Sequence, residues 1–258
     1  MNEETGVMEA GKDATDGLRD FICSLLDIPH AKSILDIGCG SGKDLRWFGQ
    51  LASEDTALVG IDSSEKAISA ALSQASDDKR FRFLTSDASE RLPFEDETFD
   101  IVYSRNFLEC VSDKDGIVRE VHRVLRPGGQ VAFSHWDWES QLFDGVDKPL
   151  VRRIVQTFAD WQQAWMTDCD GWMGRRLWRV FNRSGLFAGK IHAQVLTSTE
   201  FAEGHAGYEE AKDFGALVRR GMIRQDEYER FINDLRQLAE EGEYFYSITM
   251  FTYVGRKV

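Results

Sequence analysis

Residues 33–44 read SILDIGCGSGKD, and this stretch decides the fold. Its apolar first half is typical of a buried strand, and a helix-compatible segment follows at 43–51. Between them stand three glycines at alternate positions, Gly38, Gly40 and Gly42. Because glycine has no side chain, the backbone of such a turn can lie against a ligand at the partly positive end of the helix. The stretch therefore predicts a strand–turn–helix unit that binds a nucleotide-like molecule, with the Asp36 carboxylate beside the turn.

The glycine spacing selects among the known nucleotide-binding turns. The dinucleotide pattern G-x-G-x-x-G would need a glycine where this chain has Lys43. The phosphate-binding pattern G-x-x-x-x-G-K-S/T would need a hydroxyl side chain where this chain has Asp44. Neither pattern fits, and the turn that remains is D-x-G-x-G-x-G.

A second buried strand is expected at 57–61, and Asp62 stands at its C-terminal end. An acidic residue about 20 residues beyond the glycines, at the tip of the next strand, suits the two hydroxyls of a ribose. The alternative role of Asp62 is to cap the helix expected at 64–73, which Ser63 or Ser64 could do instead. We therefore expect Asp62 to bind a ribose.

Three further motifs follow in order. Residues 80–84 alternate like a third strand and lead into Thr-Ser-Asp-Ala at 85–88, LPFEDETFDIVYS occupies 92–104, and VLRPGG occupies 124–129. Together with the glycine turn, these motifs resemble those of the class I S-adenosylmethionine-dependent methyltransferases. The resemblance covers about residues 32–135. It implies an α/β fold with a doubly wound, seven-stranded, mostly parallel sheet whose last strand is antiparallel.

The resemblance also implies S-adenosyl-L-methionine as the cofactor. In the family, the Asp-Ala pair after the third strand approaches the adenine, a role that falls here to Asp87 and Ala88. Arg105, just past the fourth strand, is expected to meet the methionyl carboxylate or the acceptor. The full set of expected cofactor-binding residues is Asp36, Gly38, Gly40, Gly42, Asp62, Ser63, Asp87, Ala88, Ser104 and Arg105.

The second half of the chain is expected to add helical caps to this core. Its apolar periodicity predicts a helix at 149–166, a helix that ends at Gly185, a strand at 186–199, two helices broken near Gly221 and a last strand at 243–254. The resulting organisation is a flexible tail at 1–16, the cofactor-binding core at 17–136, a helical cap at 137–170, a return to the core at 171–199, a second helical cap at 200–241 and the final antiparallel strand at 242–258.

The caps are rich in aromatic residues, since six of the seven tryptophans lie between 136 and 178. Aromatic side chains at helical spacing commonly form a core, but some of these tryptophans follow directly on the fifth strand. They favour a pocket for a flat or apolar acceptor, or for a cationic amine held by cation–π contact.

The charge balance narrows the partners. The chain has 44 acidic and 31 basic residues, a net charge of −13. This balance disfavours nucleic acid, anionic membranes and acidic proteins as partners, and leaves a small-molecule acceptor. No apolar run approaches the ~20 residues of a membrane span. The four cysteines lack metal or disulfide spacing, which predicts reduced thiols and a cytoplasmic location, and no feature specifies an oligomeric state.

Methyl transfer from a sulfonium needs alignment of the acceptor, the methyl group and the sulfur, and it needs a base only if the acceptor must lose a proton. His135, at the tip of the fifth strand, is the leading candidate for that base, with a structural histidine as the competing interpretation. Glu109 and Asp137 are weaker candidates on the same rim. The spacing of the acidic and histidine residues matches no metal site, so we expect no metal.

Three functions from different classes are compatible with these motifs. The first is in-line transfer of a methyl group to an O, N or C atom of a small, aromatic or apolar metabolite. The second is another reaction in the same pocket, such as that of a cyclase or an aminopropyl-type transferase. The third is a non-catalytic binding protein, and the intact set of glycines and acidic residues argues against it.

Overall fold

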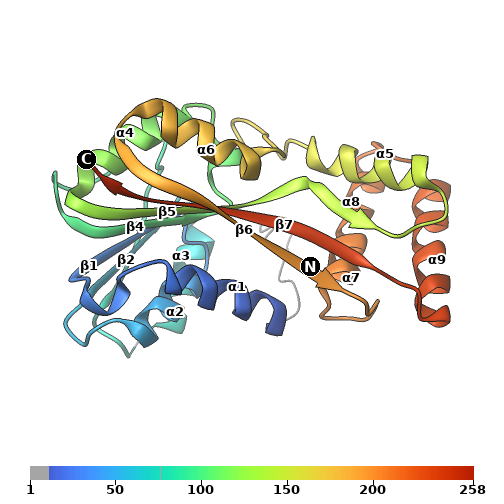
Figure 1. Ribbon diagram of the computed structural model, residues 1–258, viewed down its shortest axis with the longest axis horizontal. Coiled ribbons are helices and arrows are strands. Elements are labelled where there is room, and N and C mark those ends of the chain that lie inside the picture. Colours follow the sequence, from blue (N-terminus) through green and yellow to red (C-terminus); the bar gives the residue numbers. More distant parts are fainter. Residues whose placement is uncertain (1–11, 76) are drawn as a thin grey trace.

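The computed structural model describes residues 12–75 and 77–258. Its centre is a seven-stranded sheet in the order β3-β2-β1-β4-β5-β7-β6 (Figure 1). The pairs among β1 to β5 are parallel, whereas β7 is antiparallel to both β5 and β6, so the predicted fold class is confirmed. The strands are β1 (Ser33–Ile37), β2 (Ala57–Asp62), β3 (Phe81–Thr85), β4 (Phe99–Arg105), β5 (Leu125–Phe143), β6 (Phe187–Ser198) and β7 (Tyr246–Lys257).

Helices flank the sheet and form the far end of the molecule. They are α1 (Lys12–Ser24), α2 (Lys43–Leu51), α3 (Glu65–Gln74), α4 (Lys114–Val124), α5 (Lys148–Ala159), α6 (Met173–Ser184), α7 (Ala206–Asp213), α8 (Gly215–Arg219) and α9 (Gln225–Glu241), with short 3-10 turns η1 (Ile28–His30) and η2 (Leu108–Cys110). Helix α1 begins within the segment expected to be a flexible tail. Residues 1–11 of that expected tail lie outside the described residues.

The central strands of the sheet, β1 and β4, are buried on both faces, as their apolar runs predict. Neighbouring residues of one strand belong to different core clusters: Ile34 packs with the residues of α1, α2 and α3, and Leu35 packs with those of α4 and α6. All five residues of β1 are buried. The core therefore fixes β1 rigidly, and with it the start of the glycine turn.

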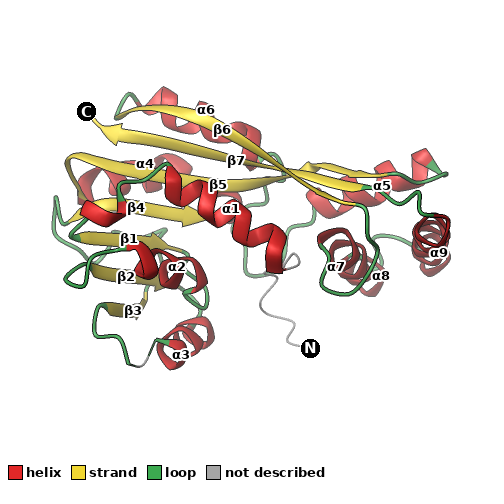
Figure 2. Ribbon diagram, turned by 60° about the horizontal axis from the view of Figure 1, so that its bottom comes forward, coloured by secondary structure: helices red, strands yellow, loops and turns green. Residues whose placement is uncertain are grey.

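Strands β5 and β7 continue past the core as an antiparallel arm with β6 (Figure 2). Strand β5 pairs with β4 only as far as Ser134, and its last pairs, Leu142 and Phe143, are with β7. The helices α5, α7, α8 and α9 gather at the far end of this arm (Figure 1). Their core is aromatic, with the ring of Phe143 4.7 Å from Tyr246 and 5.4 Å from Phe231.

The helix expected at 149–166 is shorter than predicted. Helix α5 ends at Ala159, and residues 160–172 form a loop. The loop folds back onto the helix end, because the Cys169 thiol lies 3.6 Å from the Ala159 carbonyl oxygen and Gly171 packs against the same carbonyl. A side chain at Gly171 would lie 2.3 Å from that oxygen, so glycine is required there. Apolar periodicity alone did not reveal this return of the chain.

The second insertion holds three helices in place of the two predicted. Helices α7 and α8 are separated at Phe214, a fully buried residue that caps one helix and starts the next. The predicted break near Gly221 is present, and Gly221 has a left-handed φ of 68°. Gly215 follows Phe214 directly and is the first residue of α8, but the sequence suggested a break only near Gly221.

Candidate active site

The glycine turn joins β1 to α2 at the carboxyl edge of the sheet. Gly38, Gly40 and Gly42 all have left-handed backbones, with φ of 71°, 52° and 73°. A Cβ at Gly38 would lie 3.1 Å from Phe107, and one at Gly42 would lie 2.7 Å from Phe83. In contrast, a Cβ at Gly40 would meet no atom within 4 Å. The turn is therefore closed by the protein's own aromatic rings on two sides and open at its middle glycine.

Asp62, at the end of β2, forms a hydrogen bond with the backbone of Gly40, the open position of the turn. Its two carboxylate oxygens accept from the amides of Gly40 and Ser64, each at 2.9 Å. The Ser64 hydroxyl caps α3 by accepting from the amide of Ala67 at 3.2 Å, so the helix does not need Asp62 as its cap. A carboxylate has about four acceptor sites, so Asp62 can still accept from hydroxyl groups of a ligand.

Asp36 and Asp44 place two buried carboxyl groups near the glycine turn. Burial, together with the neighbouring Asp44 carboxylate, raises the pKa of Asp36 well above its usual range. Burial opposes the ionisation of Asp44 as well, but Arg105, Arg19 and the Tyr103 hydroxyl outweigh it and lower the pKa of Asp44. Arg105 and Arg19 both approach the Asp44 carboxylate to 2.7 Å.

Arg105 is part of this network. The sequence suggested a side chain directed to the methionyl carboxylate or the acceptor, whereas the structure pairs it with Asp44. Asp44 was missed as a site residue, although an acidic residue in the first turn of a helix is a recognisable signal. Arg19 joins α1 to the same group, so this helix is fixed against the cofactor turn.

The other expected cofactor residues lie on the edge of β2, β3 and β4. Asp87 is exposed, and its Oδ1 accepts from the amide and the hydroxyl of Ser89 at 2.8 and 2.7 Å. Ala88 is buried, and Ser63 is exposed. The Ser104 hydroxyl is buried and donates to the carbonyl of Ile37 at 2.6 Å, so it ties β4 to β1.

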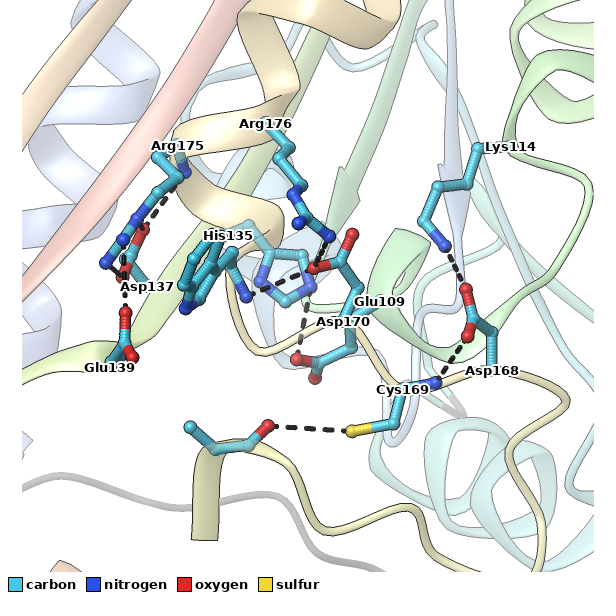
Figure 3. A network of polar contacts seen from close by, with 12 residues as sticks. Glu109, Lys114, His135, Asp137, Glu139, Asp168, Cys169, Asp170, Arg175 and Arg176 are labelled. Carbon is cyan, nitrogen blue, oxygen red and sulfur yellow. Dashed lines mark hydrogen bonds and ion pairs between the residues drawn. The ribbon is translucent and has the colours of Figure 1, made fainter. Parts of the chain in front are cut away.

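His135 lies at the same edge, one residue beyond the last β4–β5 pair. Its side chain is buried, and Nδ1 is 2.9 Å from the Trp136 carbonyl oxygen. Because a carbonyl only accepts, Nδ1 carries the proton and Nε2 holds a lone pair. No hydrogen-bond partner for Nε2 is found in the part of the chain that the structure describes, and the atom faces Glu109 Oε2 at 3.8 Å (Figure 3).

Glu109, in η2, is the partner that the sequence named only as an alternative. Its Oε2 accepts from the Trp138 indole nitrogen at 2.5 Å. Burial raises the pKa of Glu109 to about 8 and lowers the pKa of His135 to about 4. At neutral pH the pair is therefore a protonated carboxyl group beside a neutral imidazole, and Nε2 can accept a proton.

Asp137 is a poor candidate for the base. It is fully buried and bound on both oxygens by Arg175, with the Arg175 Nε 2.5 Å from Oδ2 (Figure 3). Asp170, in the loop at 160–172, forms an ion pair with Arg176, whose Nη1 lies 2.6 Å from Asp170 Oδ1. The loop at 160–172 closes over η2, because the Thr167 amide donates to the carbonyl of Cys110 at 2.9 Å. The loop thus covers Glu109, a feature that the sequence did not predict.

Within residues 12–75 and 77–258, no group of three or more His, Cys, Asp or Glu side chains is arranged to hold a metal ion. None of the helices that the structure describes is both long enough and apolar enough to cross a membrane.

Comparison with known proteins gives a consistent picture. Residues 35–133 match a family model described as a methyltransferase domain. The chain is 34% identical over 134 residues to 27-O-demethylrifamycin SV methyltransferase of Amycolatopsis mediterranei, covering 51% of this chain and 47% of that protein. It is 25% identical over 249 residues to an uncharacterized 37.1 kDa protein in transposon TN4556 of Streptomyces fradiae, covering 96% and 69%.

A solved structure has the same fold over nearly the whole chain. Haemonchus contortus phosphoethanolamine N-methyltransferase 2, in complex with S-adenosyl-L-methionine, gives a TM-score of 0.59 at 16% identity, covering 98% of this chain and 54% of that chain. The chain spans between about a quarter and a half of the length of the curated methyltransferases that it matches.

Proposed function

Because residues 35–133 match a methyltransferase domain, we propose that the chain is a class I S-adenosylmethionine-dependent methyltransferase that methylates an O, N or C atom of a small, aromatic or apolar metabolite. S-adenosyl-L-methionine is the cofactor of this family. The observation that carries the proposal is the open face of Gly40 beside the Asp62 carboxylate. The ribose or another part of a ligand can approach Gly40 without displacing any side chain.

The residues around the turn fit the cofactor in charge and hydrogen bonding. In the proposed arrangement, Asp62 accepts from the ribose hydroxyls, and Asp87 and Ala88 lie at the adenine end. Asp36 is a buried carboxyl group whose pKa is raised by burial. A ligand that carries a sulfonium and an ammonium group would favour its ionised form. Arg105 would act through Asp44, which it holds in place.

The proposed acceptor site lies across the sheet from the glycine turn. Strand β4 separates β1 from β5, so His135 is two strand spacings, or about 10 Å, from the turn. The bound cofactor supplies an electrophilic methyl group, and the protein orients the acceptor for in-line displacement. Where the acceptor atom carries a proton, His135 Nε2 would take up that proton as the acceptor is methylated.

The proposal is tested first by cofactor binding. Asp62→Ala should weaken the binding of S-adenosylmethionine by about 1–3 kcal/mol, because hydrogen bonds to a charged group are lost. Calorimetric titration measures this change. The matched control is Glu54→Ala, which should bind the cofactor normally. Glu54 is an exposed residue just before β2, at the other end of the strand from Asp62. Equal affinity in both variants would contradict the ribose assignment.

The reaction type is tested by its products. Metabolite extracts are incubated with the protein and isotopically labelled S-adenosylmethionine, and both labelled acceptor and S-adenosylhomocysteine are measured. Methyl transfer yields the two in equal amounts. Cofactor binding without S-adenosylhomocysteine would favour another reaction in the same pocket, and the absence of saturable binding would exclude both.

A further inference from the structure

Two buried polar atoms near α7 have no hydrogen-bond partner among the described residues. Glu210, on α7, is 6% exposed, and Tyr244, just before β7, is 2% exposed. Neither Glu210 Oε2 nor the Tyr244 hydroxyl forms a hydrogen bond with any other described residue. Burying such groups without partners is unfavourable, and buried polar groups in folded proteins are nearly always paired. These two atoms therefore indicate a place where the partner comes from outside the described chain.

The two groups lie together beneath α7. Gly207, one helical turn before Glu210, packs directly on the Tyr244 hydroxyl, and a Cβ there would lie only 2.0 Å from it. Burial raises the pKa of Tyr244, and the Glu210 carboxylate raises it further, so the two side chains are within electrostatic reach. Figure 1 shows α7 beside β7 at the far end of the arm. The helix thus presses a carboxyl group and a phenol into one site.

No cation of the described residues neutralises Glu210. Burial raises the pKa of Glu210 well above its usual range, Asp213 raises it further, and no basic side chain acts in the opposite direction. The nearest basic residue along the helix, Lys212, is bound to Glu209 at 3.3 Å. A carboxylate in this position can be ionised only when a positive group arrives with a ligand.

Aromatic rings complete the site. The ring of Phe201 lies 5.1 Å from Tyr244 and 5.1 Å from Tyr208. Aromatic faces attract cations, and an ammonium group brings three donors, enough for a carboxylate and a phenol oxygen together. An ammonium group would favour the ionised form of Glu210, whereas a neutral alcohol would leave the carboxyl group protonated and without an ionic partner, and an anion would disfavour ionisation further. The net charge of −13 also favours a cationic ligand over an anionic one.

We propose that Glu210 and Tyr244, both buried where α7 packs on the residues at the start of β7, form a subsite that binds the protonated amine of the methyl acceptor. The assignment to the acceptor rests on the proposed function. Tyr246 in β7 lies over the same helix, and Met250, four residues further on, pairs with Trp136 next to His135. At about 3.4 Å per residue, the amine would be held about 14 Å along the strand from Trp136. The acceptor would be elongated, with its amine remote from the atom that is methylated.

A matched pair of probes tests the charge requirement. Benzylamine is protonated at pH 7.5, and benzyl alcohol has the same shape without the charge. Their affinities for the full-length protein are measured by ligand-observed NMR. We expect benzylamine to bind at least tenfold more tightly than benzyl alcohol. Equal affinity of the two probes for the wild-type protein would overturn the proposal.

Variants then locate the site. Glu210→Gln should remove the preference for benzylamine, and Tyr244→Phe should weaken benzylamine binding at least threefold. Glu203→Gln, an exposed carboxylate shortly before α7, should leave it unchanged. Thermal melting verifies the fold of each variant, and Tyr244→Phe serves alone if Glu210→Gln does not fold. A preference that survives Glu210→Gln, or Tyr244→Phe where that variant is used alone, would place the amine elsewhere and refute the assignment.

The subsite and the proposed reaction can fail separately. Glu210→Gln should bind S-adenosylmethionine with wild-type affinity, since α7 is remote from the glycine turn. Loss of the amine preference with intact cofactor binding supports the subsite. A wild-type protein that binds benzylamine but not S-adenosylmethionine would retain the amine site and overturn the proposed function.

Discussion

Replacing Glu109 by glutamine should make the stability of the protein less sensitive to pH. The pKa of Glu109 is about 8 in the folded protein, against an ordinary value of 4.5, because the side chain is buried. Between these two values the folded state binds a proton that the unfolded chain has released. The free energy of unfolding therefore falls as pH rises through this window, and the stabilisation present at low pH is lost once pH passes 8.

The size of the effect follows from the shift in pKa. At about 1.36 kcal/mol per unit, the shift corresponds to a total of roughly 5 kcal/mol, of which about 4 kcal/mol falls between pH 5 and pH 9. Glu109→Gln keeps an oxygen that accepts from the Trp138 indole but cannot ionise. Its free energy of unfolding, relative to wild type, should therefore increase by about 4 kcal/mol over that range.

Urea unfolding at pH 5, 7 and 9 measures this difference. The opposite shift at His135, whose pKa of about 4 makes stability rise between pH 4 and 6.5, is present in both proteins and largely cancels. Glu95→Gln, an exposed carboxylate, should show no pH-dependent difference from wild type. A difference between Glu109→Gln and wild type that stays within about 1 kcal/mol from pH 5 to 9 would mean that Glu109 ionises normally, and the reasoning would be wrong.

Three substitutions in the site, with Gly128→Ala as a control outside it, test the remaining assignments. Gly40→Ala and Gly128→Ala both place a side chain in open space on a left-handed backbone. Each should lower the free energy of unfolding, measured in urea, by about 1–2 kcal/mol. Only Gly40→Ala should abolish the binding of S-adenosylmethionine measured by calorimetry. Asp44→Asn removes the carboxylate that Arg105 and Arg19 share, although Arg19 keeps its ion pair with Asp16, and should lower the free energy of unfolding by about 3–5 kcal/mol; a loss below about 1 kcal/mol would show that the network contributes little. His135→Ala should reduce turnover without weakening cofactor binding, whereas a near-normal rate would show that the acceptor needs no base from this residue.

The parts of the fold that the sequence predicted correctly depend on local signals. Helix α2 spans the predicted residues, since three glycines and a following amphipathic segment fix both the turn and the helix start. Ser64 caps α3 as one of the two expected serines, and Gly185 ends α6 in a left-handed conformation. Each of these features is decided within a few residues of the chain.

The features that the sequence did not predict depend on contacts between distant segments. Asp44 gains its role from Arg19, 25 residues earlier, and from Arg105, 61 residues later. Glu210 has the sequence appearance of a surface residue on an amphipathic helix. Only the packing of α7 against β7 shows that it is buried. Sequence periodicity shows which face of a helix is apolar. It does not show which charged side chain becomes buried when that face packs against the rest of the protein.

The segment just past β4 joins the cofactor turn to the candidate base. Arg105 binds Asp44 at the cofactor side, and Glu109, four residues later, faces His135. Between them, Asn106 has a left-handed φ of 53°, and its Oδ1 accepts from the Trp136 amide at 3.2 Å. This bond fixes the tip of β4 to the tip of β5. Residues 105–109 thus connect the ion pairs of Asp44 with the contact between Glu109 and His135 through one short stretch of backbone that is anchored to β5 at Asn106.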